Sequence, residues 1–171
     1  MRIISGSAGG RRLQPPKGLP VRPTTDLSKE AICNWIQARF DWEELIAVDA
    51  FSGTGNMGLE FASRGATVTC VEKHPAGVQW IKKASEDLRL PVQVVLKDAF
   101  SFLSKLPENI NLVFADPPYD HPRMREIPDL LNNPGVVLIL EHRSGLSFEG
   151  HPNLIEERAY GQSVFSIFET K

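Results

Sequence analysis

The stretch LIAVDAFSGTGNMGLEFASRG, residues 45–65, decides the fold of this chain. It opens with a short apolar run, passes through the glycines Gly53, Gly55 and Gly58, and continues as an amphipathic run that ends at Gly65. Glycine at such a turn admits positive φ angles and lets a ligand approach the backbone closely. We therefore predict a buried strand, a ligand-binding turn and a helix, in that order.

Strand and helix patterns alternate through the rest of the chain. Apolar strand patterns cover 67–72, 92–96, 110–115 and 135–142, and helical patterns cover 75–90, 99–106 and, broken, 125–133. Such alternation is typical of βαβ units and a parallel sheet. Residues 153–161 and 162–170 read as two strands joined at Gly161, which can only be antiparallel neighbours. The prediction is an α/β, doubly wound, mostly parallel seven-stranded sheet with a C-terminal antiparallel hairpin.

The N-terminal part has a different character. Residues 1–6 and 10–14 can pair as a small hairpin, and the proline-rich residues 14–23 predict a stiff connector. A helix should follow, capped by Thr25 or Asp26, because apolar residues recur at helical spacing: Ile32, Trp35, Ile36 and Phe40. We expect residues 1–44 to form a basic extension and residues 45–171 the main domain.

Charge is distributed unevenly along the chain. The net charge of residues 1–29 is +5, whereas that of the remaining residues is −7, which gives −2 for the whole chain. A basic segment on an acidic body is consistent with a bound polyanion at one end, although short basic termini also serve only solubility.

Composition excludes several classes of protein. The 171 residues are 42% hydrophobic, which is typical of one globular domain. Cys33 and Cys70 stand alone and the four histidines have no ligand spacing, so neither disulfides nor a metal site is expected. No apolar run has the length of a membrane span, and the first residues lack a signal-peptide core. We expect a cytoplasmic protein that does not enter membranes.

Acidic side chains mark the strand ends around the glycine turn. The G-x-G-x-x-G spacing also fits a dinucleotide site, but Asp49 would repel a pyrophosphate and suits a cation, such as a sulfonium with an amino-acid tail. Glu72, after the next strand, is placed to accept ribose hydroxyls. Asp98, after the third, could meet an adenine edge, cap the following helix, or do both.

The segment FADPPYDH, residues 114–121, ends the fourth predicted strand. Two prolines remove two backbone donors, so the strand cannot continue. In a doubly wound sheet the first and fourth strands are neighbours and ligands bind at their carboxyl ends, which places Asp116 opposite the glycine turn. The Asp116 carboxylate, the Pro117 carbonyl and the flat Tyr119 ring suit a planar base with an exocyclic amine. Acceptors on that amine stabilise the positive charge that develops when it attacks.

These motifs resemble the class I S-adenosylmethionine-dependent methyltransferases that act on amines, and most closely the RsmD family, which methylates guanine N2 in 16S ribosomal RNA. The similarity spans nearly the whole chain: MRIISGSAGGRRL, RPTTDLSKEAICNWI, DAFSGTGNMGLEFASRGA, VEK, DPPY and RAYGQSVFSIFE. Two features depart from the family: Leu27 replaces a frequent arginine, and the segment after Tyr119 is short.

The resemblance implies a Rossmann-like methyltransferase sheet, S-adenosyl-L-methionine as cofactor, and ribosomal RNA or a small-subunit assembly particle as partner. It implies these cofactor contacts: Arg22, Thr24, Asp49, Phe51, Gly53, Gly55, Glu72, Lys73, Asp98 and Ala99. The base would be held by Asp116, Pro117, Pro118 and Tyr119. The expected RNA contacts are the basic residues Arg2, Arg11, Arg12, Lys17 and Arg22.

Three alternatives remain open from sequence. A related enzyme could methylate adenine N6 or another base in RNA or DNA, although a DNA enzyme usually carries a separate recognition domain. A nicotinamide-dependent oxidoreductase would explain the glycines and Glu72, but it leaves DPPY unexplained and no Tyr-x-x-x-Lys pair is present. A relative that only binds would not need intact Asp49, Gly53, Gly55 and Asp116.

Overall fold

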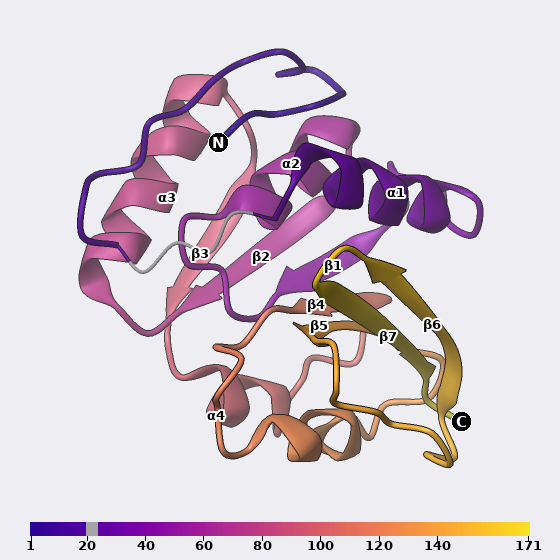
Figure 1. Cartoon of the computed structure of the whole chain (residues 1–171). Coiled ribbons are helices and arrows are strands. Elements are labelled where there is room, and N and C mark those ends of the chain that lie inside the picture. Colours follow the sequence, from indigo (N-terminus) through magenta and orange to yellow (C-terminus); the bar gives the residue numbers. More distant parts are fainter. Residues whose placement is uncertain (20–23) are drawn as a thin grey trace.

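A computed structural model describes residues 1–19 and 24–171 of the chain (Figure 1). Its helices are α1 (Asp26–Gln37), α2 (Asn56–Arg64), α3 (Pro75–Leu88), α4 (Ala99–Leu103) and the 3-10 helix η1 (Met124–Leu130). Its strands are β1 (Ile46–Asp49), β2 (Thr67–Glu72), β3 (Val92–Leu96), β4 (Leu112–Ala115), β5 (Val137–Arg143), β6 (Leu154–Tyr160) and β7 (Ser163–Glu169). Within the described residues, no helix is both long enough and apolar enough to cross a membrane.

The seven strands form one sheet in the order β3-β2-β1-β4-β5-β7-β6. Strands β1 to β5 are parallel, with Val48 opposite Thr69 on one side and Val113 on the other. β7 runs antiparallel to β5, and β6 antiparallel to β7. The predicted fold class, including the C-terminal hairpin, is confirmed. The order reverses between β1 and β4, so their carboxyl ends flank a crevice where such sheets bind ligands.

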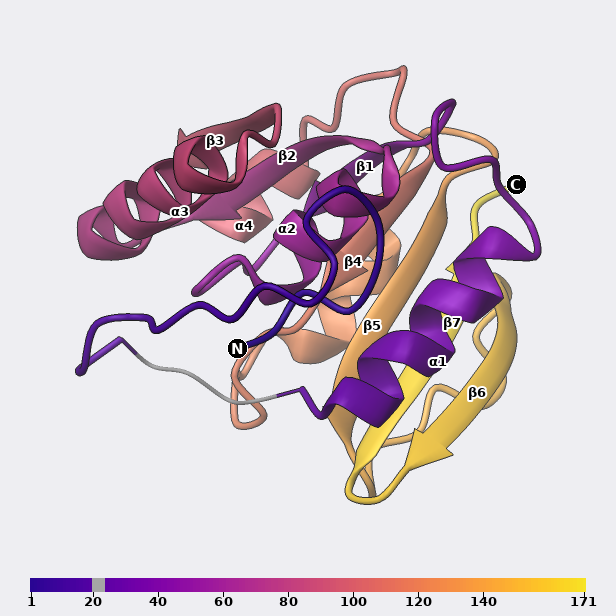
Figure 2. The same ribbon diagram turned by 90° about the horizontal axis from the view of Figure 1, so that it is seen from above.

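Helices cover both faces of the sheet (Figure 2), and the buried apolar residues form two clusters. One cluster joins α1, α2 and α3 through residues such as Ile36, Phe61 and Ile81. The other joins α4 and η1 through Phe100, Leu103 and Ile127. The central strands are buried on both faces, as parallel strands covered by helices require.

The N-terminal residues pack against α2. Arg2 and Arg12 form an antiparallel bridge, and Ile3 N–H donates to the Arg11 carbonyl at 2.9 Å. Ile3 is fully buried in the cluster that also joins α1 and α2. Gly6 has φ +82°, and a Cβ there would lie 1.8 Å from the Ser63 carbonyl oxygen, so only glycine permits this approach.

Two helices differ from the sequence prediction. Thr25 caps α1 by accepting from the Ser28 N–H, but the helix ends at Gln37, so Phe40 lies beyond it in a turn. The segment 125–133, predicted as a broken helix, forms the 3-10 helix η1 with Pro128 inside. Proline cannot donate and its ring disfavours an α-helical interior, which accounts for the tighter, shorter helix. Residues 20–23 of the predicted connector lie outside the described residues.

Candidate active site

A cavity opens at the carboxyl ends of β1, β2 and β4, where the crevice was predicted. Ten predicted site residues line it: Thr24, Asp49, Phe51, Gly53, Glu72, Lys73, Asp98, Ala99, Asp116 and Pro118. The lining also includes residues that sequence reasoning did not assign to a ligand: Ala50, Ser52, Thr54, Asn56, Met57, Val71, His74, Lys97, Phe114 and His121. The glycine turn and the DPPY segment therefore share one cavity.

Two buried carboxylates hold the glycine turn in shape. Asp49 Oδ2 accepts from the Gly58 N–H at 2.9 Å, and Glu72 Oε2 accepts from the Gly53 N–H at 2.7 Å. Glu72 Oε1 accepts from the His74 N–H at 2.9 Å. Each carboxylate oxygen has a second lone pair, so Glu72 can still accept a ribose hydroxyl. Gly77 makes room for this arrangement, since a Cβ there would lie 2.9 Å from Glu72 Cγ.

The α4 end of the cavity is aromatic. Asp98 caps α4 by accepting from the Ser101 N–H, which confirms its capping role, and it also lines the cavity. The His121 ring stacks on Phe100 with centroids 4.8 Å apart, and Phe51 meets Phe100 edge-on at 5.7 Å. A flat apolar wall beside a carboxylate suits a heterocycle such as adenine.

The DPPY loop contributes residues to the cavity and to a second hollow. Asp116 and Pro118 line the cavity, Pro117 is buried, and Tyr119 lines the hollow. Gly55, with φ +75°, shapes the start of α2 and does not line the cavity. Arg22 lies outside the described residues.

A hydrogen-bonded chain that sequence reasoning missed orients the Tyr119 ring. The Ser163 hydroxyl donates to Glu141 Oε1 at 2.8 Å, so the Tyr119 hydroxyl, 2.9 Å from Ser163 Oγ, is the donor of that bond. Glu141 is 1% exposed, and its other oxygen accepts from the Thr24 hydroxyl at 3.5 Å. The chain ties the DPPY loop to β5, β7 and the entry to α1. In the sequence Glu141 was only the end of an apolar strand, and its partners come from distant elements.

We expect Ser163→Ala to lower kcat/KM for methyl transfer by about 3- to 10-fold, the equivalent of one neutral hydrogen bond. Tyr119→Phe should have an effect of similar size, and the double variant should be no worse than Ser163→Ala alone, because both substitutions remove the Tyr119–Ser163 bond. The measurement is a double-mutant cycle on steady-state rates, with S-adenosylhomocysteine affinity as control. Additive losses would show that the bond does not orient the ring.

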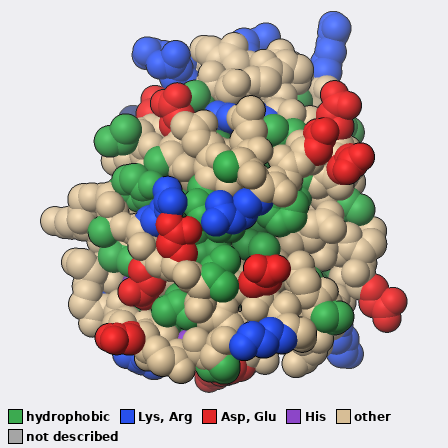
Figure 3. All heavy atoms as spheres, turned by 90° about the vertical axis from the view of Figure 1, so that its right-hand side faces the viewer, with side chains coloured by type: hydrophobic (Ala, Val, Ile, Leu, Met, Phe, Trp, Pro, Cys, Tyr) green, Lys and Arg blue, Asp and Glu red, His purple; other side chains and the backbone are tan. Residues whose placement is uncertain are grey.

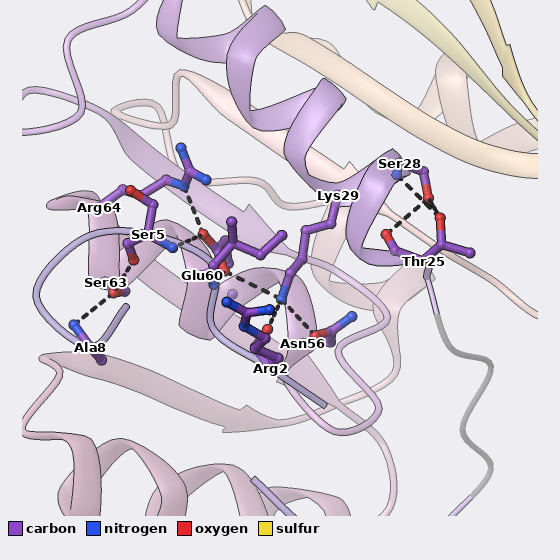
Figure 4. Close-up of polar contacts among 12 residues, drawn as sticks. Arg2, Ser5, Ala8, Thr25, Ser28, Lys29, Asn56, Glu60, Ser63 and Arg64 are labelled. Atoms are coloured by element: carbon purple, nitrogen blue, oxygen red, sulfur yellow. Dashed lines mark hydrogen bonds and ion pairs between the residues drawn. The ribbon is translucent and has the colours of Figure 1, made fainter. Parts of the chain in front are cut away.

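A second buried network joins the N-terminal segment to α2 and the glycine turn (Figure 4). Glu60 accepts from Arg64 Nε at 2.8 Å and from the backbone N–H groups of Ile4 and Ser5. Lys29 Nζ lies 3.3 Å from Glu60 and donates to Asn56 Oδ1 at 2.9 Å and to the Arg2 carbonyl. Both Lys29 and Glu60 are fully buried. Asn56 lines the cavity, so this network positions a cofactor-side residue.

The charges around the cavity fit S-adenosylmethionine. The described lining carries four carboxylates (Asp49, Glu72, Asp98 and Asp116) and two lysines (Lys73 and Lys97). An acidic lining disfavours the pyrophosphate of a dinucleotide and favours a sulfonium and an amino-acid ammonium. Asp49 and the glycine turn would hold the amino-acid part, Glu72 the ribose, and Asp98 with Ala99 the adenine. S-adenosylmethionine supplies an electrophilic methyl group when it is bound.

The Asp49 carboxyl changes its protonation state near neutral pH. Burial raises the pKa of Asp49 to about 7, and the Glu72 carboxylate acts in the same direction. Because this pKa is raised, the folded protein without ligand keeps a proton on Asp49 at pH values where the unfolded chain has released it. Asp49 therefore contributes to the stability of the fold at low pH, and this contribution is lost as the pH rises toward 7. A cationic ligand instead favours the ionised form.

We therefore expect affinity for S-adenosylhomocysteine, which carries an ammonium group, to rise from about pH 5.5 to about pH 8.5. Asp49→Asn keeps an oxygen for the Gly58 N–H and should flatten this dependence. Isothermal titration calorimetry across the pH range measures both proteins. Affinity of the wild type that does not change with pH would contradict the role given to Asp49.

Four of the five predicted RNA-contact residues lie on the surface of the N-terminal segment, and the fifth, Arg22, is outside the described residues. These four exposed residues are Arg2, Arg11, Arg12 and Lys17. Lys29 also contributes to the positive net charge of residues 1–29, but it is buried. The side of the molecule that carries α1, β6 and β7 shows basic and acidic side chains intermixed (Figure 3). There Arg158 and Arg39 pair with Glu156. On that face the described charges of opposite sign offset one another, which disfavours it as a polyanion site.

The strand order and this cavity together define an S-adenosylmethionine-dependent methyltransferase with a Rossmann-like sheet. The family model Conserved hypothetical protein 95 matches residues 1–169. The chain is 31% identical to ribosomal RNA small subunit methyltransferase D of Escherichia coli, over 99% of the chain and 89% of the relative. The chain belongs to this family, the RsmD family of the sequence resemblance.

Solved structures agree with this assignment. The Escherichia coli protein yhhF superposes with a TM-score of 0.82 at 30% identity, covering 100% of this chain and 98% of that one. A hypothetical protein of Thermus thermophilus gives a TM-score of 0.85 at 27% identity, covering 99% of both chains.

Proposed function

We propose that this protein acts in the cytoplasm and transfers a methyl group from S-adenosylmethionine to the exocyclic N2 of a guanine in 16S ribosomal RNA. One observation carries the proposal: Asp116 and the glycine turn line the same cavity. The name of the Escherichia coli relative supports small-subunit ribosomal RNA as the substrate class. The resemblance through the N-terminal RPTTD segment supports guanine over adenine.

The residues of the DPPY loop account for the chemistry. An exocyclic amine is a weak nucleophile because its lone pair is delocalised into the ring. The Asp116 carboxylate and the Pro117 carbonyl accept the amine hydrogens, which favours a pyramidal nitrogen and stabilises its growing positive charge. S-adenosylmethionine held by Asp49, Glu72 and Asp98 would supply the methyl group, and its sulfur would keep the electron pair of the broken C–S bond. The amine nitrogen would form the new N–C bond and would release its proton to solvent. The proline pair keeps both acceptors fixed, so the remaining task is positioning.

The N-terminal extension, residues 1–44, offers phosphate contacts. Extruding a guanine from its stack costs a few kcal/mol, and contacts of Arg2, Arg11, Arg12 and Lys17 with the RNA backbone offset that cost. Because Ile3 and the backbone of Ile4 and Ser5 are part of the packed fold, deleting the segment would disturb the protein itself. Substitution of exposed side chains is the cleaner test.

We expect Arg11→Gln with Arg12→Gln to weaken binding of ribosomal RNA and to flatten its salt dependence. Affinity for S-adenosylhomocysteine should stay unchanged, since both side chains are exposed and neither lines the cavity. Filter binding at several salt concentrations measures the RNA affinity. Equal loss of RNA and cofactor affinity would refute a role confined to phosphate contact.

The proposal is tested by incubating the protein with labelled methyl donor and unmethylated 16S RNA, either naked or assembled into small-subunit particles. Nucleoside analysis by mass spectrometry should find N2-methylguanosine. N6-methyladenosine, or label only in DNA, would overturn the substrate assignment. Thermal stabilisation by NADH but not by S-adenosylhomocysteine would overturn the reaction class.

A further inference from the structure

A second hollow adjoins the catalytic loop and has no part in the chemistry described above. It lies between the segment that follows DPPY and the turn that follows β5, and its lining is Tyr119, Asp120, His121, Pro122, Met124, Arg125, Arg143, Ser144, Gly145 and Leu146. His121 lines both this hollow and the cofactor cavity. The two spaces are therefore neighbours, and residues of the DPPY loop line both of them.

Two arginines give the hollow its charge. Arg125 and Arg143 are both exposed, and neither takes part in the ion pairs found among the described residues. Arg64, Arg123 and Arg158, in contrast, each pair with a glutamate at 2.8 Å or less. Asp120 is the one acid of the described lining, so the hollow keeps a positive balance.

Arg125 is held through its side chain, and Arg143 is placed by its backbone. Arg125 Nη1 donates to the Ser147 carbonyl at 3.2 Å, and its guanidinium lies 6.0 Å from the Phe148 ring centroid. Arg143 is the last residue of β5, and its backbone pairs with Ser163 of β7 in the ladder. Guanidinium groups that no acid neutralises are suited to bidentate contacts with phosphate oxygens.

The geometry points to a binding site for an RNA phosphate in this hollow, held by Arg125 and Arg143. This inference rests on the proposed function and extends it to the RNA backbone next to the target nucleotide. A base held at Asp116 carries its own sugar and phosphates with it. Asp116 and Pro118 line the cavity while Tyr119, on the same loop, lines the hollow, so the backbone of a nucleotide seated at this loop has the hollow as its neighbour.

The test uses the double variant Arg125→Gln, Arg143→Gln and whichever form of 16S RNA the wild type methylates. We expect RNA affinity to fall by about tenfold or more at moderate salt, and the slope of log K against log salt to decrease by about one to two units. The loss should be similar for a 16S RNA and for an unrelated RNA, because phosphate contacts carry no sequence information. Affinity for S-adenosylhomocysteine should not change.

The matched control is Lys105→Gln. Lys105 is exposed in the connection between α4 and β4, at the amino ends of the strands, and so on the opposite edge of the sheet. Arg125→Lys with Arg143→Lys should recover only part of the affinity, because lysine keeps the charge but cannot make the bidentate contact.

Each outcome decides the inference. RNA affinity and salt slope like those of the wild type would overturn it, and so would an equal loss of S-adenosylhomocysteine affinity or a loss confined to one RNA sequence. A wild type that methylates no RNA would instead refute the proposed function, so the two failures are distinguishable.

Discussion

Asp116→Ala should lower the rate of methyl transfer by about 100-fold or more while leaving S-adenosylhomocysteine affinity within about threefold. The carboxylate is the charged acceptor of the DPPY loop and faces the cavity at the carboxyl end of β4. An acceptor that stabilises charge developing on the reacting nitrogen acts in the transition state, so its loss should appear in kcat as well as in kcat/KM. The glycine turn, Glu72 and Asp98 remain in place, so the cofactor should still bind.

The measurement combines single-turnover methylation rates with calorimetric binding of S-adenosylhomocysteine. Glu108→Ala is the control, because Glu108 is an exposed acid in the connection before β4, at the edge of the sheet away from the cavity. Loss of cofactor affinity in step with the rate would mean that Asp116 belongs to the cofactor site. A rate near that of the wild type would remove Asp116 from the chemistry altogether.

Glu60→Gln is expected to lower the free energy of unfolding by about 3–5 kcal/mol, the largest effect on stability. Glu60 balances the buried Lys29 and accepts from Arg64 and from two backbone N–H groups. Burial already lowers the pKa of Lys29, which shows how much this site depends on the opposite charge. A glutamine amide would leave the ammonium without a counter-charge and would turn a donor toward other donors.

Chemical denaturation measures this effect, with Glu86→Gln on the exposed side of α3 as the matched control. Adding Lys29→Met to Glu60→Gln should recover part of the loss, because the uncompensated charge is then gone. The two substitutions should therefore be strongly non-additive. A change below about 1 kcal/mol in the single variant would contradict the role of the network.

The sequence predicted the sheet because its signals are local. Apolar strands, glycine turns and amphipathic helices alternate, and each pattern depends on near neighbours in the chain. The site residues at strand ends were predicted from one rule, that doubly wound sheets bind ligands at the carboxyl ends of their strands. Asp49 and Glu72 end their strands, and Asp116 follows directly after a neighbouring strand. The proline in 125–133 predicts the interruption of an α-helix, but the sequence pattern did not distinguish a broken α-helix from the 3-10 helix that forms.

The two buried networks could not be predicted in this way. No sequence pattern linked Lys29 with Glu60, and only the folded N-terminal segment shows that they are paired and buried. Glu141 and Ser163 are 22 residues apart, and they meet because β7 returns antiparallel to β5. Such contacts are tertiary, and no local pattern encodes them.

We propose that one cavity holds both the methyl donor and the amine. A crystal structure of the protein with S-adenosylhomocysteine is the decisive measurement. We expect the sulfur in the cavity between the glycine turn and Asp116, close enough for a single carbon to bridge to an amine bound by that carboxylate. A sulfur that faces away from Asp116, or a ligand bound elsewhere on the sheet, would contradict it.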